Sequence, residues 1–387
     1  MTRIAYAGQD GAIYSVEPDG ADPRSLAPPA TESTWPTWSS DGSCIAFSGL
    51  RSGMNGLGHL AVYVKGPGDS EARAIYTNEP GTDAIARKTP HYALWSPDGG
   101  TLSFIAQTWR GGLTLFTHDL STDGEALGLV SGSPLYMSWS ADSRFLLAHS
   151  RDAHYLIDFK EGREALRMPG VSGLYMAPSW SPRAGRMALM QDASGGRQRL
   201  LVGSIDEGRT RTVAEIAGRA AFGWRPDGTG IGLARDLDAA PGYFGGLWLV
   251  DAESAEERRV ADESLLCFFW SPDGSRVAYV TPSDNAEGSL RWAVVDVDGD
   301  GGPRYLADFR PTQEQLTAFM FFDQYGQSHS PWSPDGARIV FSGVLGLESV
   351  RTPLPDGSAT GVFVVDVDGG GEPRQIGQGS IGVWSPA

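Results

Sequence analysis

The sequence predicts an all-β protein, an eight-bladed β-propeller built of four-stranded antiparallel blades. Three observations predict this fold: a tryptophan-led turn recurs along the chain, a short apolar run follows each copy, and the two chain ends together complete one more copy. Units of about 40 to 50 residues are typical of propeller blades. Closing the ring removes the exposed sheet edges that would otherwise pair with other chains.

The recurring turn reads WSPDG in its most complete form. Its copies begin at Trp38, Trp95, Trp139, Trp180, Trp224, Trp270, Trp332 and Trp384. The copy at Trp180 lacks Asp-Gly, but the apolar run after Arg186 restores the strand pattern in register. In such a turn Ser and Asp bond the backbone, Pro fixes φ and Gly takes positive φ, so we assign these residues a structural role.

Two strand patterns follow each turn. Residues 102–106 and 339–341 are examples of the first run, and residues 113–117 and 361–365 of the second. Short alternating or apolar runs bounded by turn residues predict strands, and Asp368-Gly369 is one of the Asp-Gly pairs that favour a tight hairpin. With the run before each tryptophan and the run after each hairpin, every unit has four antiparallel strands.

The chain ends complete one repeat. Residues 384–387 joined to residues 1–8 read WSPA-MTRIAYAG, which aligns without a gap on WSPDGARIVFSG at residues 332–343. We therefore expect the ring to be closed by N- and C-terminal strands that share one blade, formed by residues 1–27 plus 380–387. Because the repeats leave no room for a second domain, residues 1–387 are predicted to form a single domain.

The repeated WSPDG turn, followed by strands of the I-A-F or R-V-A-Y type, resembles the TolB-like β-propeller repeat, a WD40-like repeat that is also found in the propeller domains of prolyl oligopeptidases. The resemblance covers essentially the whole chain and implies the propeller fold. Such propellers serve as binding platforms, as gates to hydrolase domains and occasionally as enzymes. The sequence contains no G-x-S-x-G nucleophile elbow, so we do not expect a serine hydrolase.

The chain carries 47 acidic and 31 basic residues, a formal net charge of −16. This balance, without a Lys/Arg-rich patch, disfavours nucleic acid and anionic membrane surfaces as partners. No stretch of about 18 apolar residues occurs, and residues 1–8 already read as a strand without a leader before them. We therefore expect no membrane insertion and a cytoplasmic monomer. TolB itself is periplasmic, so removal of a leader peptide is the alternative.

The long insertions indicate a binding face. In an up-and-down blade the A–B and C–D turns lie on one face, and the B–C and D–A connections lie on the other. Here the first set is short, while the second set holds all the irregular segments, at residues 49–59, 78–90, 236–245, 308–328 and 344–359. Loops on a rigid scaffold carry function more often than the scaffold does, so we predict that this face binds a ligand.

Side chains that combine an aromatic body with a polar tip are predicted around the channel mouth on that face. Such residues stack organic ligands or grip peptides, although packing between blades is the alternative for each of them. The candidate ligand-binding residues are Trp35, His91, Tyr92, Tyr136, Tyr175, Asp323, Gln324, Tyr325 and His329.

The segment 308–328 is unusually apolar for a loop because it contains Phe319, Phe321, Phe322 and Tyr325. A solvated loop would not carry these aromatic side chains. The segment therefore plugs the channel, folds as a small helical lid over residues 312–319, or contacts a partner protein.

We expect a non-catalytic binding or scaffolding propeller that recognises a protein or peptide partner through the elaborated face, with a small-molecule ligand as a further option. No catalytic residue and no cofactor are predicted.

The alternative is a metal-assisted lyase or hydrolase that acts on a small molecule at the channel mouth, with His91, His329 and Asp323 as metal ligands. No HxxxH, HxH or CxxC element supports it, so metal binding stays open. The acidic run at residues 296–301 starts like a calcium loop but recurs as an ordinary hairpin turn.

Overall fold

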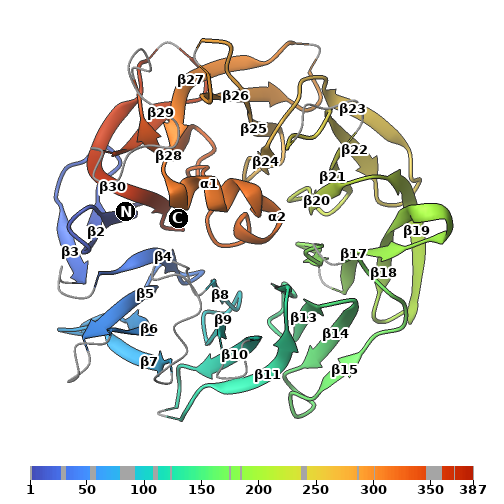
Figure 1. The fold of residues 1–387 in the computed structure, drawn as a ribbon, viewed down its shortest axis with the longest axis horizontal. Coiled ribbons are helices and arrows are strands. Elements are labelled where there is room, and N and C mark those ends of the chain that lie inside the picture. Colours follow the sequence, from blue (N-terminus) through green and yellow to red (C-terminus); the bar gives the residue numbers. More distant parts are fainter. Residues whose placement is uncertain are drawn as a thin grey trace.

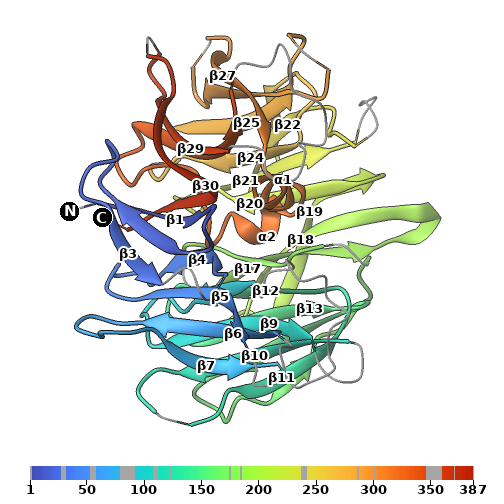
Figure 2. The same ribbon diagram turned by 60° about the vertical axis from the view of Figure 1, so that its left-hand side comes forward.

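The computed structural model describes residues 2–27, 32–52, 58–78, 92–107, 112–122, 124–173, 176–183, 185–236, 242–285, 287–299, 301–345, 360–369 and 371–386. The strands form a ring of sheets around a central space, and two short helices lie inside that space (Figure 1). The two chain ends lie side by side in both views (Figure 2). The fold is that of an all-β propeller, as the repeats predict.

Five sheets in the described part of the chain have four antiparallel strands each. The first comprises β4 (Thr34–Trp38), β5 (Ile45–Ser52), β6 (Gly58–Lys65) and β7 (Arg73–Thr77). The second comprises β8 (Ala93–Trp95), β9 (Thr101–Gln107), β10 (Leu113–Asp119) and β11 (Leu127–Gly132). The third comprises β12 (Leu135–Trp139), β13 (Phe145–Ser150), β14 (Ala153–Asp158) and β15 (Ala165–Arg167).

The fourth sheet comprises β16 (Ser179–Trp180), β17 (Arg186–Asp192), β18 (Arg197–Ser204) and β19 (Arg209–Ala217), with the short 3-10 helix η2 (Ser194–Gly196) between β17 and β18. The fifth comprises β20 (Ala220–Trp224), β21 (Gly230–Arg235), β22 (Leu247–Asp251) and β23 (Glu257–Ala261). The run after Arg186 is a strand, as predicted for the divergent repeat at Trp180.

The remaining ten strands form one continuous sheet. In spatial order they are β24 (Cys267–Trp270), β25 (Arg276–Pro282), β26 (Leu290–Asp296), β27 (Arg304–Pro311), β28 (Arg338–Val344), β29 (Gly361–Asp366), β30 (Arg374–Trp384), β1 (Ile4–Gly8), β2 (Ile13–Val16) and β3 (Arg24–Ala27). Because these strands are not separated into individual blades, the count of eight blades stays a prediction, as does the single-domain assignment.

The ring closes through the pairing of β30 with β1. Ile4 lies opposite Trp384 and Tyr6 opposite Gly382, in antiparallel register. The Arg3 N–H donates to the Ser385 Oγ at 2.9 Å, which fastens the two ends beyond the strands. The prediction that N- and C-terminal strands share one sheet is confirmed.

The tryptophan turns have the geometry that their sequence predicts. In each of five copies the serine Oγ donates to the Oδ1 of the aspartate two residues later, at 2.5–2.6 Å. In four of these copies the glycine that follows takes positive φ, for example 71° at Gly274 and 68° at Gly336, and in the copy at Trp139 Ser143 takes it at 59°. These turns are architectural.

The indole of six of the eight repeats donates a hydrogen bond to the preceding unit; the indoles of Trp38 and Trp180 have no acceptor among the described residues. The Trp95 Nε1 donates to the Thr37 carbonyl at 3.1 Å, and the Trp332 Nε1 donates to the Phe269 carbonyl at 3.0 Å. The Trp384 Nε1 likewise donates to a carbonyl of the preceding unit. One recurring residue therefore supplies both apolar packing and a hydrogen bond between neighbouring units.

The segment after β27 plugs the ring. Asp308 itself belongs to β27, and the chain then forms α1 (Gln313–Met320) and α2 (Phe322–Tyr325) at the centre of the molecule (Figure 1). The helix α1 contacts β27, β28 and β30, while α2 contacts β12, β20 and β24 on other sides of the ring. Phe319 is completely buried and packs 5.4 Å from the Trp292 ring. Both the helix and the plug that the sequence allowed are therefore present.

Neither helix is long and apolar enough to cross a membrane, and no other helix of the described residues is.

Candidate binding site

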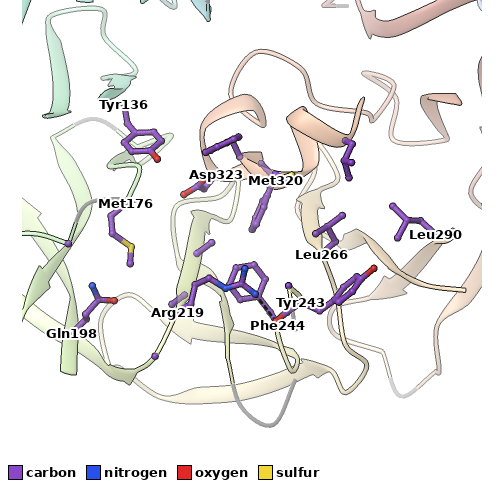
Figure 3. Close-up of a pocket in the computed structure, with 18 of the residues that line it drawn as sticks. Tyr136, Met176, Gln198, Arg219, Tyr243, Phe244, Leu266, Leu290, Met320 and Asp323 are labelled. Atoms are coloured by element: carbon purple, nitrogen blue, oxygen red, sulfur yellow. Dashed lines mark hydrogen bonds between the residues drawn. The ribbon is translucent and has the colours of Figure 1, made fainter. Parts of the chain in front are cut away.

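A cavity of about 1120 Å³ lies beside the central plug. Its walls come from the connections β15–β16, β17–β18, β19–β20, β21–β22, β23–β24 and β25–β26, and its inner side comes from α1 and α2 (Figure 3). All of these connections are of the B–C or D–A kind. The cavity therefore opens on the face that the long insertions indicated.

Apolar side chains form much of the cavity wall. They come from three units and from the plug: Met176, Tyr243, Phe244, Leu266, Leu290 and Met320 (Figure 3). The Met320 side chain is 59% exposed, which is unusual for a large apolar residue and places an uncovered thioether at the cavity. This surface can bury the apolar side chains of a ligand.

Charged side chains supply polarity, because the lining contains Arg197, Arg219, Arg310, Asp192 and Asp323. The Arg219 Nη2 donates to the Tyr243 carbonyl at 2.7 Å, and the guanidinium lies 4.5 Å from the centre of the Phe244 ring, so the side chain is held in place (Figure 3). Asp323 projects from α2 into the cavity, where burial raises the pKa of its carboxyl to about 6. Arg310 lines the wall at the start of the plug.

Of the candidate residues that the sequence suggested, Tyr136 and Asp323 line this cavity. Tyr136 stands at the start of the inner strand β12, and its ring stacks at 5.9 Å on the ring of His149. The Asp323 carboxylate accepts the Gln324 N–H at 3.1 Å. These two residues lie where a ligand in the cavity would contact them.

Three other candidates pack together inside the ring. Tyr325 lies 4.6 Å from Trp35 and 5.8 Å from His329, measured between ring centres, and all three side chains are buried. The His329 Nδ1 is 2.7 Å from the Ser328 Oγ, and burial lowers the pKa of the imidazole to about 4. His329 is therefore neutral at pH 7 and forms part of the packing around the plug.

Tyr92 and Gln324 fix the plug to the inner strands. The Tyr92 hydroxyl donates to the Gln324 carbonyl at 2.8 Å, and burial raises the pKa of that hydroxyl well above its usual range. Both side chains are buried. The last two candidates, His91 and Tyr175, lie outside the described residues.

The metal alternative requires His91 in addition to His329 and Asp323. Within the described ranges no three His, Cys, Asp or Glu side chains gather closely enough to hold a metal ion. Of the described pair, Asp323 lines the cavity whereas His329 packs against Trp35. The metal-assisted reaction thus stays a prediction.

Arginine side chains neutralise the acidic turn that starts like a calcium loop. Asp298 forms ion pairs with Arg225 at 3.1 Å and with Arg258 at 2.5 Å. Asp296 pairs with Arg304 at 2.7 Å. These carboxylates therefore join neighbouring strands and turns, as in an ordinary hairpin.

Sequence reasoning did not single out several residues of the cavity. Tyr243 and Phe244 lie in the insertion at 236–245, and Arg310 and Met320 lie in the segment 308–328, so the insertions had marked their neighbourhood. Arg219 follows a short connection and carried no signal. Only the folded ring brings these three segments to one cavity.

No family model matches the chain, and no curated protein matches it. Solved structures do. TolB from Acinetobacter baumannii is 18% identical with a TM-score of 0.40, and the match covers 77% of this chain and 61% of TolB. An oligogalacturonate lyase in complex with manganese is 17% identical with a TM-score of 0.52, covering 73% and 77%.

Dipeptidyl peptidase 4 from Porphyromonas gingivalis is 12% identical with a TM-score of 0.62, and the match covers 96% of this chain and 57% of the peptidase. The chain thus spans less than two thirds of the length of TolB and of this peptidase. The similar structures are β-propeller proteins. The resemblance that the WSPDG turns predicted is therefore confirmed at the level of the fold.

Proposed function

We propose that this protein is a non-catalytic binding propeller whose cavity beside the plug takes up a segment of a partner polypeptide. The observation that carries the proposal is the cavity of about 1120 Å³ on the face of the B–C and D–A connections. This volume slightly exceeds the range of roughly 300–1,000 Å³ that is typical of small-molecule sites. A peptide segment fits such a cavity better than a small metabolite does.

Glycines along the cavity support a peptide ligand. Gly173, Gly196, Gly218, Gly242 and Gly288 all line it. Four of them have positive φ, for example 91° at Gly242 and 71° at Gly196, where other residues are strained. Because glycine has no side chain, a ligand can approach the peptide groups of these connections and bond them through its own main chain. The apolar side chains between them would hold the ligand's side chains.

A displayed library of random peptides, selected on the immobilised protein, tests the proposal. The selected peptides are then titrated against the parent and against the variant with Leu266→Gln and Met320→Gln. Both substituted residues line the cavity and neither is fully buried. Loss of apolar contact with these two side chains is expected to weaken binding at least tenfold.

The matched control is Leu166→Gln, which changes an apolar side chain that is 59% exposed on β15, outside the cavity. It should bind like the parent. Peptides that bind the cavity variant as tightly as the parent would contradict the proposed site. The proposal retains the expectation of a cytoplasmic monomer, and light scattering of the purified protein measures the oligomeric state.

A further inference from the structure

Arg310 is a buried cation with an incomplete set of partners. The residue is 6% exposed, and its Nη2 donates to the Glu287 carbonyl at 2.7 Å. Among the described residues, its Nε and Nη1 have no hydrogen-bond partner and no carboxylate forms an ion pair with it. A buried guanidinium without a counter-ion is costly, so such a group is retained where a ligand completes it.

The beginning of α1 lies at the same end of the cavity. Thr312 caps the helix by accepting the Gln315 N–H at 3.1 Å, and Thr312 and Gln313 both line the cavity next to Arg310. The first N–H groups of a helix, here those of Gln313 and Glu314, have no acceptor within the helix. They carry a partial positive charge that favours an anion.

Arg219 extends the positive character along the same cavity. It forms no ion pair with a described carboxylate, and its hydrogen bond to Tyr243 and its contact with Phe244 keep the guanidinium in the cavity wall. Most other arginines of the described chain are paired with an aspartate or glutamate, although the protein as a whole carries a net charge of −16. Because Asp192 and Asp323 also line the cavity, it is the end with the buried Arg310 and the start of α1 that favours a negatively charged group of the ligand.

We propose that the cavity captures the C-terminal end of a partner polypeptide, with the terminal carboxylate bound by Arg310 and the N-terminal amides of α1, and with the last side chains against Leu290 and Leu316. This inference rests on the proposed function. Leu290 and Leu316 line the cavity together with Arg310. Capture of a terminal carboxylate by backbone N–H groups and a cation is a known mode of peptide recognition.

A single terminal carboxylate suits this protein better than an acidic peptide does. The net charge of −16 repels a segment that carries several acidic side chains. An apolar C-terminus brings one charge, which Arg310 can neutralise, and the apolar wall can bury the rest.

Three N-acetylated dipeptides test the inference by isothermal titration at fixed ionic strength: acetyl-Leu-Leu with a free C-terminus, the same dipeptide as its C-terminal amide, and acetyl-Asp-Leu amide. The free acid should bind at least tenfold more tightly than either amide. Arg310→Gln should remove that preference, whereas Arg374→Gln should retain it, because Arg374 is exposed on β30 and does not line the cavity.

The inference would be overturned if the parent bound the free acid and its amide equally well, or bound the aspartyl amide as tightly as the free acid. It would also be overturned if the parent did not bind the free acid at a dipeptide concentration on the order of 10 mM, where even weak ligands bind. Thermal unfolding of Arg310→Gln shows whether the variant is folded. If it is not, the difference in affinity of the parent for the free acid and for the amide tests the inference.

The same test separates this inference from the proposed function. Library peptides could require Leu266 and Met320 for binding and yet bind equally well after C-terminal amidation. That result would support the proposed binding function and contradict the binding of a terminal carboxylate. Peptides that bind independently of the cavity would contradict the proposed function itself.

Discussion

The side chain of Gln324 pairs with the main chain of Met137 as a neighbouring strand would. Its Oε1 accepts the Met137 N–H at 2.8 Å, and its Nε2 donates to the Met137 carbonyl at 2.9 Å. Met137 lies on the inner strand β12, whose free edge faces the ring centre. One buried amide thus satisfies both main-chain groups of an inner strand and fixes the plug that forms one side of the cavity.

Gln324→Ala should lower the free energy of unfolding by about 2–3 kcal/mol, since it removes two hydrogen bonds and leaves the buried Met137 N–H unpaired. Denaturant-induced unfolding measures the effect. Gln327→Ala is the matched control, because the Gln327 Nε2 reaches the same carbonyl at the longer distance of 3.3 Å. We expect a loss of less than about 1 kcal/mol for the control. Equal losses for the two variants would refute the role assigned to Gln324.

Asp323 should make stability depend on pH. Burial raises the pKa of its carboxyl from 3.8 to about 6, so the folded protein binds the proton more tightly than the unfolded chain does. The contribution of this residue to stability is therefore largest below pH 3.8 and falls as the pH rises to 6. At pH 7 it lowers the free energy of unfolding by at most about 3 kcal/mol, since one pKa unit corresponds to about 1.4 kcal/mol.

Asp323→Asn keeps the shape of the side chain and removes its titration. The variant should be more stable than the parent at pH 7, and the difference should shrink as the pH is lowered toward 4. Chemical unfolding of both proteins across this range measures the difference, in which the titration of all other carboxylates cancels. A difference that does not change with pH would show that Asp323 titrates normally.

The indole of Trp384 should matter more than that of Trp38. The Trp384 Nε1 donates to the Pro331 carbonyl at 2.9 Å, and the Arg338 guanidinium lies 5.3 Å from the centre of the Trp384 indole. The Trp38 Nε1, in contrast, has no acceptor within the described chain.

We expect Trp384→Phe to cost about 2 kcal/mol of unfolding free energy, and Trp38→Phe about 1 kcal/mol, because only the first substitution also breaks a hydrogen bond between units. Thermal or denaturant unfolding of both variants measures the two costs. The reverse order would contradict the view that the terminal repeat closes the ring through its tryptophan.

The fold was predictable because its determinants are local and repeated. Each WSPDG turn carries its own hydrogen-bond partners, and the match of the chain ends places β30 beside β1. The helix in the segment 308–328 was also predictable. Thr312 is a residue type that commonly caps a helix, and the four aromatic side chains after it indicate a buried segment. The number of blades did not follow from the structure, because ten strands form one continuous sheet.

The candidate site was predictable only in part. The insertions indicated the face, and Tyr136 and Asp323 lie at the cavity as expected. The same criterion, an aromatic side chain with a polar tip near the channel mouth, also selected Trp35 and Tyr325. These two side chains pack against each other, because the plug fills the channel. Arg219 escaped notice because an arginine in a short connection has no distinguishing pattern, and its role arises only where six connections converge.

The most direct test of the account is hydrogen–deuterium exchange with and without a saturating peptide selected from the random library. We expect slower exchange at residues 192–198, 218–221 and 242–244 and at the start of α1, because these segments contribute to the cavity wall. We expect no change at the tryptophan turns of the opposite face, such as residues 271–275. Protection confined to those turns would place binding on the other face and contradict the account.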